Sequence, residues 1–358
     1  MPAADRVYKI PDSWMGPKGP KYAFVTFIMR NDSYLPGALV LASGLRKASA
    51  GGDLVCLVTG SVTGQAKSAL AALYDKVVDV DEAVLPHARR QERQDRPFLF
   101  TRFNALRLGA DGDLGCSYEK IVVLDSDILP LRNYGHLFTL GTPAGIINER
   151  KEHCLEASPE GRFLIPPGAM QTGKWVWHQV YEPICPHGQP IDRSITDRVL
   201  TDPTNMGVNA CLWVLRPSMD EYLAIMEDVE RPEVLEQVSN WSWPEMQYAT
   251  ARWSGQWKNV DLRFASFSGY PSPRVVFGIH FAGLKPWSIK KKAALERWSR
   301  YEDFQLWYRE YQSLMAAHPE LRAVGRLRRL LEEMPAPRPD RGKDAQGSKK
   351  GSYGRRSR

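Results

Sequence analysis

The sequence predicts an α/β protein built on a mostly parallel sheet with helices on both of its faces. Short apolar runs rich in β-branched residues alternate with longer segments that place apolar residues at helical spacing. Alternation of this kind is typical of a parallel sheet covered on both sides. The chain has 358 residues, of which 43% are hydrophobic, so it is long enough for one large or two small domains with a substantial core.

In the amino-terminal half, predicted strands and helices follow one another in strict order. Pro36 stands near the first turn of the first helix, where a missing N–H group costs little. The last of these strands leads directly into an acidic pair. The predicted strands are 22–27, 54–58, 76–80 and 120–124, and the predicted helices are 36–47, 65–74 and 101–108.

The segment 148–204 lacks clear periodicity and is rich in Pro, Gly and aromatic residues. Long irregular segments in compact domains are commonly functional, so we interpret it as an insertion that contributes to a binding site. Regular pattern then returns, and Pro217-Ser218 marks the start of a helix. The predicted elements are a strand at 207–215, a helix at 219–229 and a helix with an apolar stripe at 301–315.

Two carboxylates follow the apolar run 121–124, in the sequence Asp125-Ser126-Asp127. Residues i and i+2 of an extended segment share a face, so both acids can approach one hard cation such as Mg²⁺ or Mn²⁺. The carboxyl ends of strands are also where open α/β sheets bind ligands. A solvated turn is the alternative explanation of this pattern. Neither a GxGxxG nor a GxxxxGK[ST] fingerprint occurs, which disfavours a dehydrogenase or a P-loop enzyme.

The net charge of +7 lies mostly in the tail from Arg338 to Arg358, where eight basic residues face two acidic ones. This tail offers few apolar side chains, so we expect it to be disordered. We expect no nucleic-acid partner for the protein. Five scattered cysteines favour reduced thiols. No apolar signal segment or membrane span is apparent, and we therefore expect a cytoplasmic protein.

Several motifs resemble those of glycosyltransferase family 8, which contains glycogenins and galactinol synthases. The match extends from residue 22 to residue 287, in the order of the family. The segments that carry it are Val25-Thr26-Phe27, Asn31-Asp32-Ser33-Tyr34 and Gly37-Ala38-Leu39-Val40-Leu41; Asp125-Ser126-Asp127 with Leu131-Arg132-Asn133 and Leu137-Phe138; Asn209-Ala210-Cys211-Leu212-Trp213-Val214-Leu215-Arg216-Pro217-Ser218; Pro244-Glu245-Met246-Gln247-Tyr248; and His280-Phe281-Ala282-Gly283-Leu284-Lys285-Pro286-Trp287.

This resemblance implies a GT-A fold and the transfer of a hexose, either glucose or galactose, from a UDP-sugar to a hydroxyl with retention of configuration. The implied metal is Mn²⁺, with Mg²⁺ as the alternative, and its ligands are Asp125, Asp127 and His280. An imidazole ligand favours Mn²⁺ over Mg²⁺. The resemblance gives Lys285 the role of neutralising the leaving diphosphate, and Gly283 that of letting backbone approach it.

Further roles carry over from the same motifs. An aromatic face can stack the uracil, an amide can read its edge, and a guanidinium can contact the donor bidentately. The resemblance makes Glu245 the acid beside the reacting sugar carbon, with Asn209 as its partner in catalysis. The implied donor-binding residues are Phe27, Asn31, Tyr34, Arg102, Ser126, Asn209 and Ala210, in addition to the metal ligands.

Two departures from the family pattern concern residues near the donor sugar. Met246 stands where the family has Gln, which replaces a hydrogen-bonding side chain by an apolar one and leaves the donor sugar open. Cys211 stands where the family has Gly. The loop between Gly283 and Lys285 is one residue shorter than usual, and the first motif is one residue longer at Ile28-Met29-Arg30. No charged group is lost, so we expect an active enzyme.

We divide the chain into an amino-terminal extension (1–20), a GT-A domain (21–318) with the insertion 148–204 on its acceptor side, a helical segment (319–334) and a disordered basic tail (335–358). The expected acceptor is a carbohydrate, a polyol or a lipid-linked hydroxyl, and a homodimer is left open. One alternative is a self-glucosylating primer of the glycogenin type. Two observations disfavour it: the segment 261–274 is short, and Tyr270 is a poor candidate for the acceptor tyrosine. The other is a catalytically silent protein that binds through its basic tail.

Overall fold

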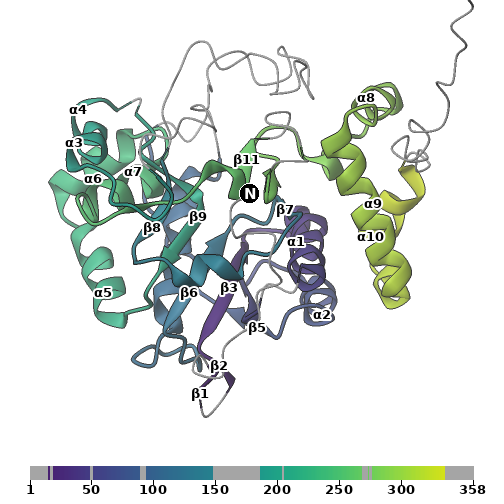
Figure 1. Ribbon diagram of the computed structural model, residues 1–358, viewed down its shortest axis with the longest axis horizontal. Helices are drawn as coiled ribbons and strands as arrows, with labels where there is room; N and C mark the ends of the chain where they lie inside the picture. The colour runs from purple at the N-terminus through teal and green to yellow at the C-terminus, as the bar shows by residue number, and fades with distance from the viewer. Residues whose placement is uncertain are drawn as a thin grey trace, which may run out of the picture.

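A seven-stranded, mostly parallel sheet forms the centre of the protein (Figure 1). The computed structural model describes residues 15–16, 19–48, 51–88, 94–147, 186–203, 205–267, 273 and 276–334. The strand order is β10-β8-β9-β6-β3-β4-β5, and β9 alone among these runs antiparallel to its neighbours. The α/β prediction is thus confirmed. The strands are β3 (Tyr22–Ile28), β4 (Asp53–Val58), β5 (Lys76–Asp79), β6 (Lys120–Leu124), β8 (Ala144–Ile147), β9 (Val208–Leu215) and β10 (Lys258–Asn259).

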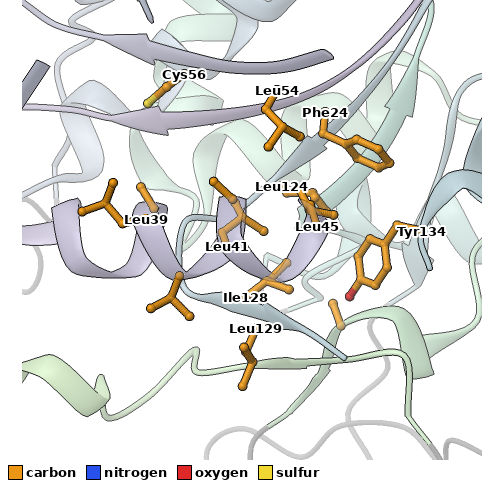
Figure 2. Close-up of a cluster of buried hydrophobic side chains, with 14 of the residues drawn as sticks. Phe24, Leu39, Leu41, Leu45, Leu54, Cys56, Leu124, Ile128, Leu129 and Tyr134 are labelled. Atoms are coloured by element: carbon orange, nitrogen blue, oxygen red, sulfur yellow. The ribbon is translucent and has the colours of Figure 1, made fainter. Parts of the chain in front are cut away.

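Alternating side chains of the central strands divide the core into two layers. Successive residues of a strand point to opposite faces, and nearly every residue of β3, β4 and β6 is buried, as parallel strands covered on both sides require. Phe24, Leu54 and Leu124 pack on the face covered by α1 (Leu35–Lys47), as Figure 2 shows. Val25 and Val55 belong to the layer on the opposite face.

Helices cover both faces of the sheet. The helices α1 (Leu35–Lys47) and α2 (Gly64–Ala71) bury their apolar residues in one layer, while α5 (Met219–Asp228) and α7 (Pro244–Arg252) contribute to the other. The helix predicted at 101–108 is instead part of a longer 3-10 helix, η4 (Arg96–Leu108). Within it, the Asn104 side chain donates to the Thr101 carbonyl at 2.9 Å, a local hydrogen bond that competes with regular helical pairing.

A small second sheet lies beside the carboxyl end of β6. It consists of β7 (Ile128–Pro130), β12 (Gly278–His280) and β11 (Ser266–Phe267), in the order β11-β12-β7. The strands β12 and β7 are antiparallel, and His280 pairs with Ile128. This pairing brings the last part of the fold directly to the acidic pair that follows β6.

The helix α9 (Glu302–Ala317) packs against α1, and α10 (Gly325–Glu333) packs on α9 (Figure 1). Ser43 of α1 donates to Glu310 of α9 at 2.5 Å, and Tyr311 donates to the Leu327 carbonyl of α10 at 2.9 Å. Among the helices in the described part of the chain, none has the length and apolar character needed to cross a membrane. The helices are α8 (Lys292–Trp298), α9 (Glu302–Ala317) and α10 (Gly325–Glu333).

Most of the predicted insertion lies outside the described residues, but the structure describes its last part, residues 186–203, which leads back to the sheet. The segment that contains His187 runs beside β10, with Gly188 N–H donating to the Asn259 carbonyl at 2.7 Å. His187 Nδ1 accepts from the Asp261 N–H at 3.0 Å, so a neutral His187 must carry its proton on Nε2, which faces His136 Nε2 at 3.1 Å. Protonation of His187 would therefore break the bond to Asp261.

This histidine pair predicts an acid-sensitive contribution to stability. Burial and the neighbouring His136 lower the pKa of His187 from 6.5 to about 4. The unfolded chain binds the proton first as pH falls, so stability is fully present above pH 6.5 and is lost between about pH 6.5 and 4, by at most about 3 kcal/mol.

We expect His187→Gln to flatten the fall in the free energy of unfolding over that pH window, measured by urea denaturation at a series of pH values. His318→Gln, at a partly exposed position between α9 and η10 (Pro319–Ala323), is the control. Parallel pH profiles for wild type and His187→Gln would contradict this assignment.

Candidate active site

The two acids predicted from the sequence lie in a tight turn after β6. The Ile128 N–H donates to the Asp125 carbonyl at 3.2 Å, which closes the turn. The Asp125 N–H donates to the Cys211 carbonyl of β9 at 2.9 Å, and the Phe281 N–H donates to the Asp127 carbonyl at 3.0 Å. Backbone from two other parts of the chain therefore fixes both acidic residues.

A glycine allows α1 to approach this turn closely. A Cβ atom on Gly37 would lie 2.4 Å from the Ser126 carbonyl oxygen and 2.5 Å from the Trp287 ring. Any larger residue would displace the turn or the tryptophan. Gly37 thus explains in physical terms why the first motif of the chain includes a glycine in a helix, where it otherwise costs stability.

His280 completes a group of three metal-ligating side chains with the two acids. Its Nε2 lies 3.5 Å from Asp125 Oδ2 and 3.3 Å from Asp127 Oδ1. One potential ligand atom from each of the three side chains lies within 4.8 Å of the other two. Asp127 and His280 are buried, and Asp125 is partly exposed.

Each of the two carboxylates pairs with a different cation. Arg102 Nη2 donates to Asp125 Oδ1 at 2.6 Å, and Arg102 Nη1 donates to the Ala210 carbonyl at 2.7 Å. Lys285 forms a short ion pair with Asp127 Oδ2. Its ammonium also donates to the carbonyls of Phe281 and Ala282, at 2.6 and 3.1 Å.

These cations keep both acids ionised. Burial alone would raise the pKa of Asp125, but Arg102 and His280 outweigh burial and the pKa is lowered. Burial likewise acts to raise the pKa of Asp127, and Lys285 and His280 bring it well below its ordinary value. Ionised carboxylates are the form that coordinates a metal ion.

The donor set fits a divalent cation. Two ionised carboxylates from one turn and an imidazole from a distant strand converge, and oxygen and nitrogen donors of this kind suit a divalent metal ion. Arg102 pairs with Asp125, and Lys285 pairs with Asp127. The two acids and His280 can therefore hold a metal ion, and Lys285 can bind an anionic group of a ligand in addition to Asp127.

Several predicted donor-binding residues surround this centre. The Lys285 ammonium lies 5.7 Å from the centre of the Tyr34 ring, and the Tyr34 side chain is 38% exposed. Phe27 is buried beneath the Arg102 guanidinium, 5.8 Å from the ring centre, so it supports Arg102 from the core. Asn31 is exposed, and its side chain accepts from the Ser33 N–H at 2.8 Å.

The residues predicted near the sugar lie in the same region but at different depths. Glu245 is 3% exposed and occupies the first turn of α7, where it interacts electrostatically with Arg102. Asn209 of β9 is buried, and its side chain accepts from the Cys211 N–H at 2.9 Å. Ser126 and Ala210 are buried in the turn and in β9, and Gly283 lies half-buried in the loop between His280 and Lys285.

Two tryptophans shape the site although no role was predicted for either. Trp213 of β9 lies under Arg102, 5.7 Å from ring centre to guanidinium carbon. Trp287 packs edge-on against Tyr34 at 5.8 Å. Both tryptophans lie within the sequence motifs, and this position was the one feature that could have indicated a role in the site. An aromatic residue in a strand or after a proline, however, predicts core packing more often than a binding site.

Comparison with known proteins finds similarity to glycogenins and to a galactinol synthase. No protein-family profile matches the chain. An uncharacterised protein, R707, of Acanthamoeba polyphaga mimivirus is 28% identical over 278 residues, which cover 75% of this chain and 83% of that protein. Glycogenin-1 of Caenorhabditis elegans is 35% identical over 120 residues, 33% of this chain and 26% of that protein. Galactinol synthase 10 of Arabidopsis thaliana is 30% identical over 142 residues, 40% of this chain and 41% of that protein.

Among solved structures, the galactosyltransferase LgtC in complex with donor and acceptor sugar analogues superposes with a TM-score of 0.49 at 14% identity, over 78% of this chain and 94% of that chain. The matches to the named sequence relatives span less than half of each relative. They agree with the resemblance read from the motifs. The chain is therefore similar to a glycogenin and to a galactinol synthase over 33% and 40% of its length.

Proposed function

We propose that this protein transfers a hexose, glucose or galactose, from a UDP-sugar to a hydroxyl acceptor with retention of configuration and with Mn²⁺ as cofactor. The observation that carries the proposal is the convergence of Asp125, Asp127, His280 and Lys285 at the carboxyl end of β6. A divalent metal and a cationic side chain both stabilise a diphosphate leaving group, and this group of residues offers ligands for the metal and supplies the cation. Mg²⁺ is the alternative metal.

In this proposal Asp125, Asp127 and His280 hold the metal, which when bound stabilises the negative charge that develops on the diphosphate. Lys285 leaves its ion pair with Asp127 and contacts a phosphate oxygen. That exchange is electrostatically favourable, because a phosphate oxygen is negatively charged and can replace the carboxylate as the partner of the ammonium, while a bound cation would neutralise Asp127. Gly283 keeps the connecting backbone close to the phosphates.

The nucleoside is assigned to the surface around Tyr34. Tyr34 exposes a ring that can stack a base, and Asn31 exposes an amide nearby in sequence. Phe27 is only 7% exposed, so it has little surface with which to contact the base. We assign it the indirect role of supporting the Arg102 guanidinium. Ser126 and Ala210 contribute backbone groups to the donor site.

The sugar is assigned to the side of the centre that holds Arg102, Asn209 and Glu245. Arg102 lies between the metal-binding Asp125 and the acid Glu245. Glu245 is placed to stabilise positive charge on the sugar ring, with Asn209 orienting the donor. We assign the acceptor, a carbohydrate, a polyol or a lipid-linked hydroxyl, to the insertion 148–204, of which residues 186–203 are described.

The test is a donor screen with UDP-glucose, UDP-galactose, UDP-xylose and GDP-mannose in the presence of Mn²⁺ or Mg²⁺. We expect UDP release from a UDP-hexose that depends on Mn²⁺, and an α-linked product by the anomeric coupling in NMR. Intact mass after incubation separates the second candidate, a self-glucosylating primer, by stepwise hexose additions. Release of no nucleotide from any donor, with salt-sensitive binding of DNA or lipid that is lost when the chain ends at Met334, would favour a silent binding protein.

A further inference from the structure

The chain turns sharply at Arg30, directly after β3. Arg30 has a φ of 68°, and among the residues that the structure describes it is the one non-glycine residue with a positive φ. Across it, the Asn31 N–H donates to the Met29 carbonyl at 2.8 Å, which is the hydrogen bond of a γ-turn. A γ-turn with positive φ at its centre is rare and strained. Strain of this kind persists only where surrounding contacts hold it, and it is concentrated at binding sites.

Three contacts hold Arg30 in this conformation. Its backbone N–H donates to Thr59 Oγ1, just after β4, at 3.0 Å. Its guanidinium donates from Nη1 to the Gln94 carbonyl at 2.9 Å and lies over the Phe98 ring, with the guanidinium carbon 4.3 Å from the ring centre. Phe98 belongs to the first turn of η4, the element that also carries Arg102. The side chain of Arg30 therefore ties the end of β3 to the start of η4.

The four residues after Arg30 contain both of those assigned to the nucleoside. Asn31 caps the short 3-10 helix η3 (Asp32–Tyr34), which ends at the exposed Tyr34 ring. On one side the Asp32 carboxylate fixes this segment, because it accepts from the Thr63 N–H at 3.0 Å and from the Thr63 hydroxyl at 2.7 Å. The guanidinium contacts described above fix the chain where the segment begins.

We propose that Arg30 is a positioning residue for the nucleoside. Its contacts with Gln94 and Phe98 hold the segment 31–34 in the orientation in which Asn31 and Tyr34 bind the base. The first motif is one residue longer here than in the related family, which gives the segment additional freedom that these contacts remove. This inference rests on the proposed function and adds a residue that acts through the segment 31–34, away from the metal ligands.

The experiment measures two affinities of the full chain by titration calorimetry, for Mn²⁺ alone and for UDP in saturating Mn²⁺. We expect R30A to weaken UDP binding about 10-fold, because it removes a hydrogen bond from a charged group and a cation–π contact. The affinity for Mn²⁺ should stay unchanged, since Arg30 contacts none of the three metal-ligating side chains in the described part of the chain.

The partner ring allows a second, independent measurement. F98L removes the aromatic face beneath the guanidinium and should weaken UDP binding by less than R30A does. The double variant R30A/F98L should bind UDP no more weakly than R30A, because the two substitutions remove the same contact. Losses that add in the double variant would contradict the proposed contact.

Arg107 provides a matched control at the other end of η4. Its guanidinium lies over the Tyr222 ring at 5.3 Å, and like Arg30 it is partly buried. R107A should bind UDP as the wild type does. Equal losses in R30A and R107A would show a general effect of removing a stacked arginine and would contradict the proposal.

The outcomes separate this inference from the function on which it rests. Wild-type affinity for UDP in R30A would overturn the positioning role and leave the proposed function intact. A wild-type protein that binds no UDP in Mn²⁺ would overturn the proposed function and this inference with it. If R30A does not fold, R30G carries the same expectation, because glycine adopts a positive φ without strain and still lacks the guanidinium.

Discussion

Asp127→Asn is expected to lower sugar transfer by about 1,000-fold, which corresponds to about 4 kcal/mol in the activation free energy. Asp127 is the acid that faces both His280 and Lys285, so its loss removes a ligand charge from the centre of the site. Asparagine has the same shape and leaves the backbone contact to Phe281 in place. The measurement is initial rate at saturating Mn²⁺, with circular dichroism to confirm folding.

An acid at the end of another strand serves as the control for this substitution. Asp79 ends β5 and pairs with Lys67, away from the metal-binding group. Asp79→Asn should retain wild-type activity. Near wild-type transfer by a folded Asp127→Asn protein would refute the role of this carboxylate in metal binding.

Lys285→Met is expected to weaken the binding of UDP about 10- to 100-fold, the loss of one or more hydrogen bonds between charged groups. Methionine keeps most of the buried side-chain volume but removes the charge. Lys285 also competes with the metal for Asp127 Oδ2. The variant should therefore bind Mn²⁺ at least as tightly as wild type, in contrast to Asp127→Asn, which should lose Mn²⁺ and UDP together.

Calorimetry with Mn²⁺ alone and then with UDP measures the two affinities separately. Lys290→Met is the control, because Lys290 lies in the same segment but is exposed. Loss of Mn²⁺ affinity in Lys285→Met would mean that the lysine stabilises the carboxylate and not the diphosphate. Unchanged affinity for UDP would exclude Lys285 from phosphate binding.

The regular part of the fold could be predicted because local patterns determine it. The strands β3, β4 and β6 are short apolar runs, and each lies within a residue of its predicted bounds. The acids after β6 were predictable for the same reason, since the end of a strand fixes where they lie. By contrast, the 3-10 geometry of η4 depends on side-chain bonds that no periodicity reveals.

The assembly of the site could not be predicted from local pattern. His280 reaches the acids through pairing of two three-residue strands, β7 and β12, which are too short to give a periodic signal. Only the family resemblance suggested it as a ligand. The support of Arg102 by Trp213 is also long-range, and the sequence offered no sign of it.

The central claim is that this site binds a nucleotide diphosphate through a metal. Titration calorimetry of UDP into the full chain, in Mn²⁺ and in EDTA, tests that claim most directly. The account predicts saturable binding of UDP in Mn²⁺ that is lost in EDTA and in Asp127→Asn. Binding of UDP with equal affinity in EDTA, or no binding in Mn²⁺, would contradict it.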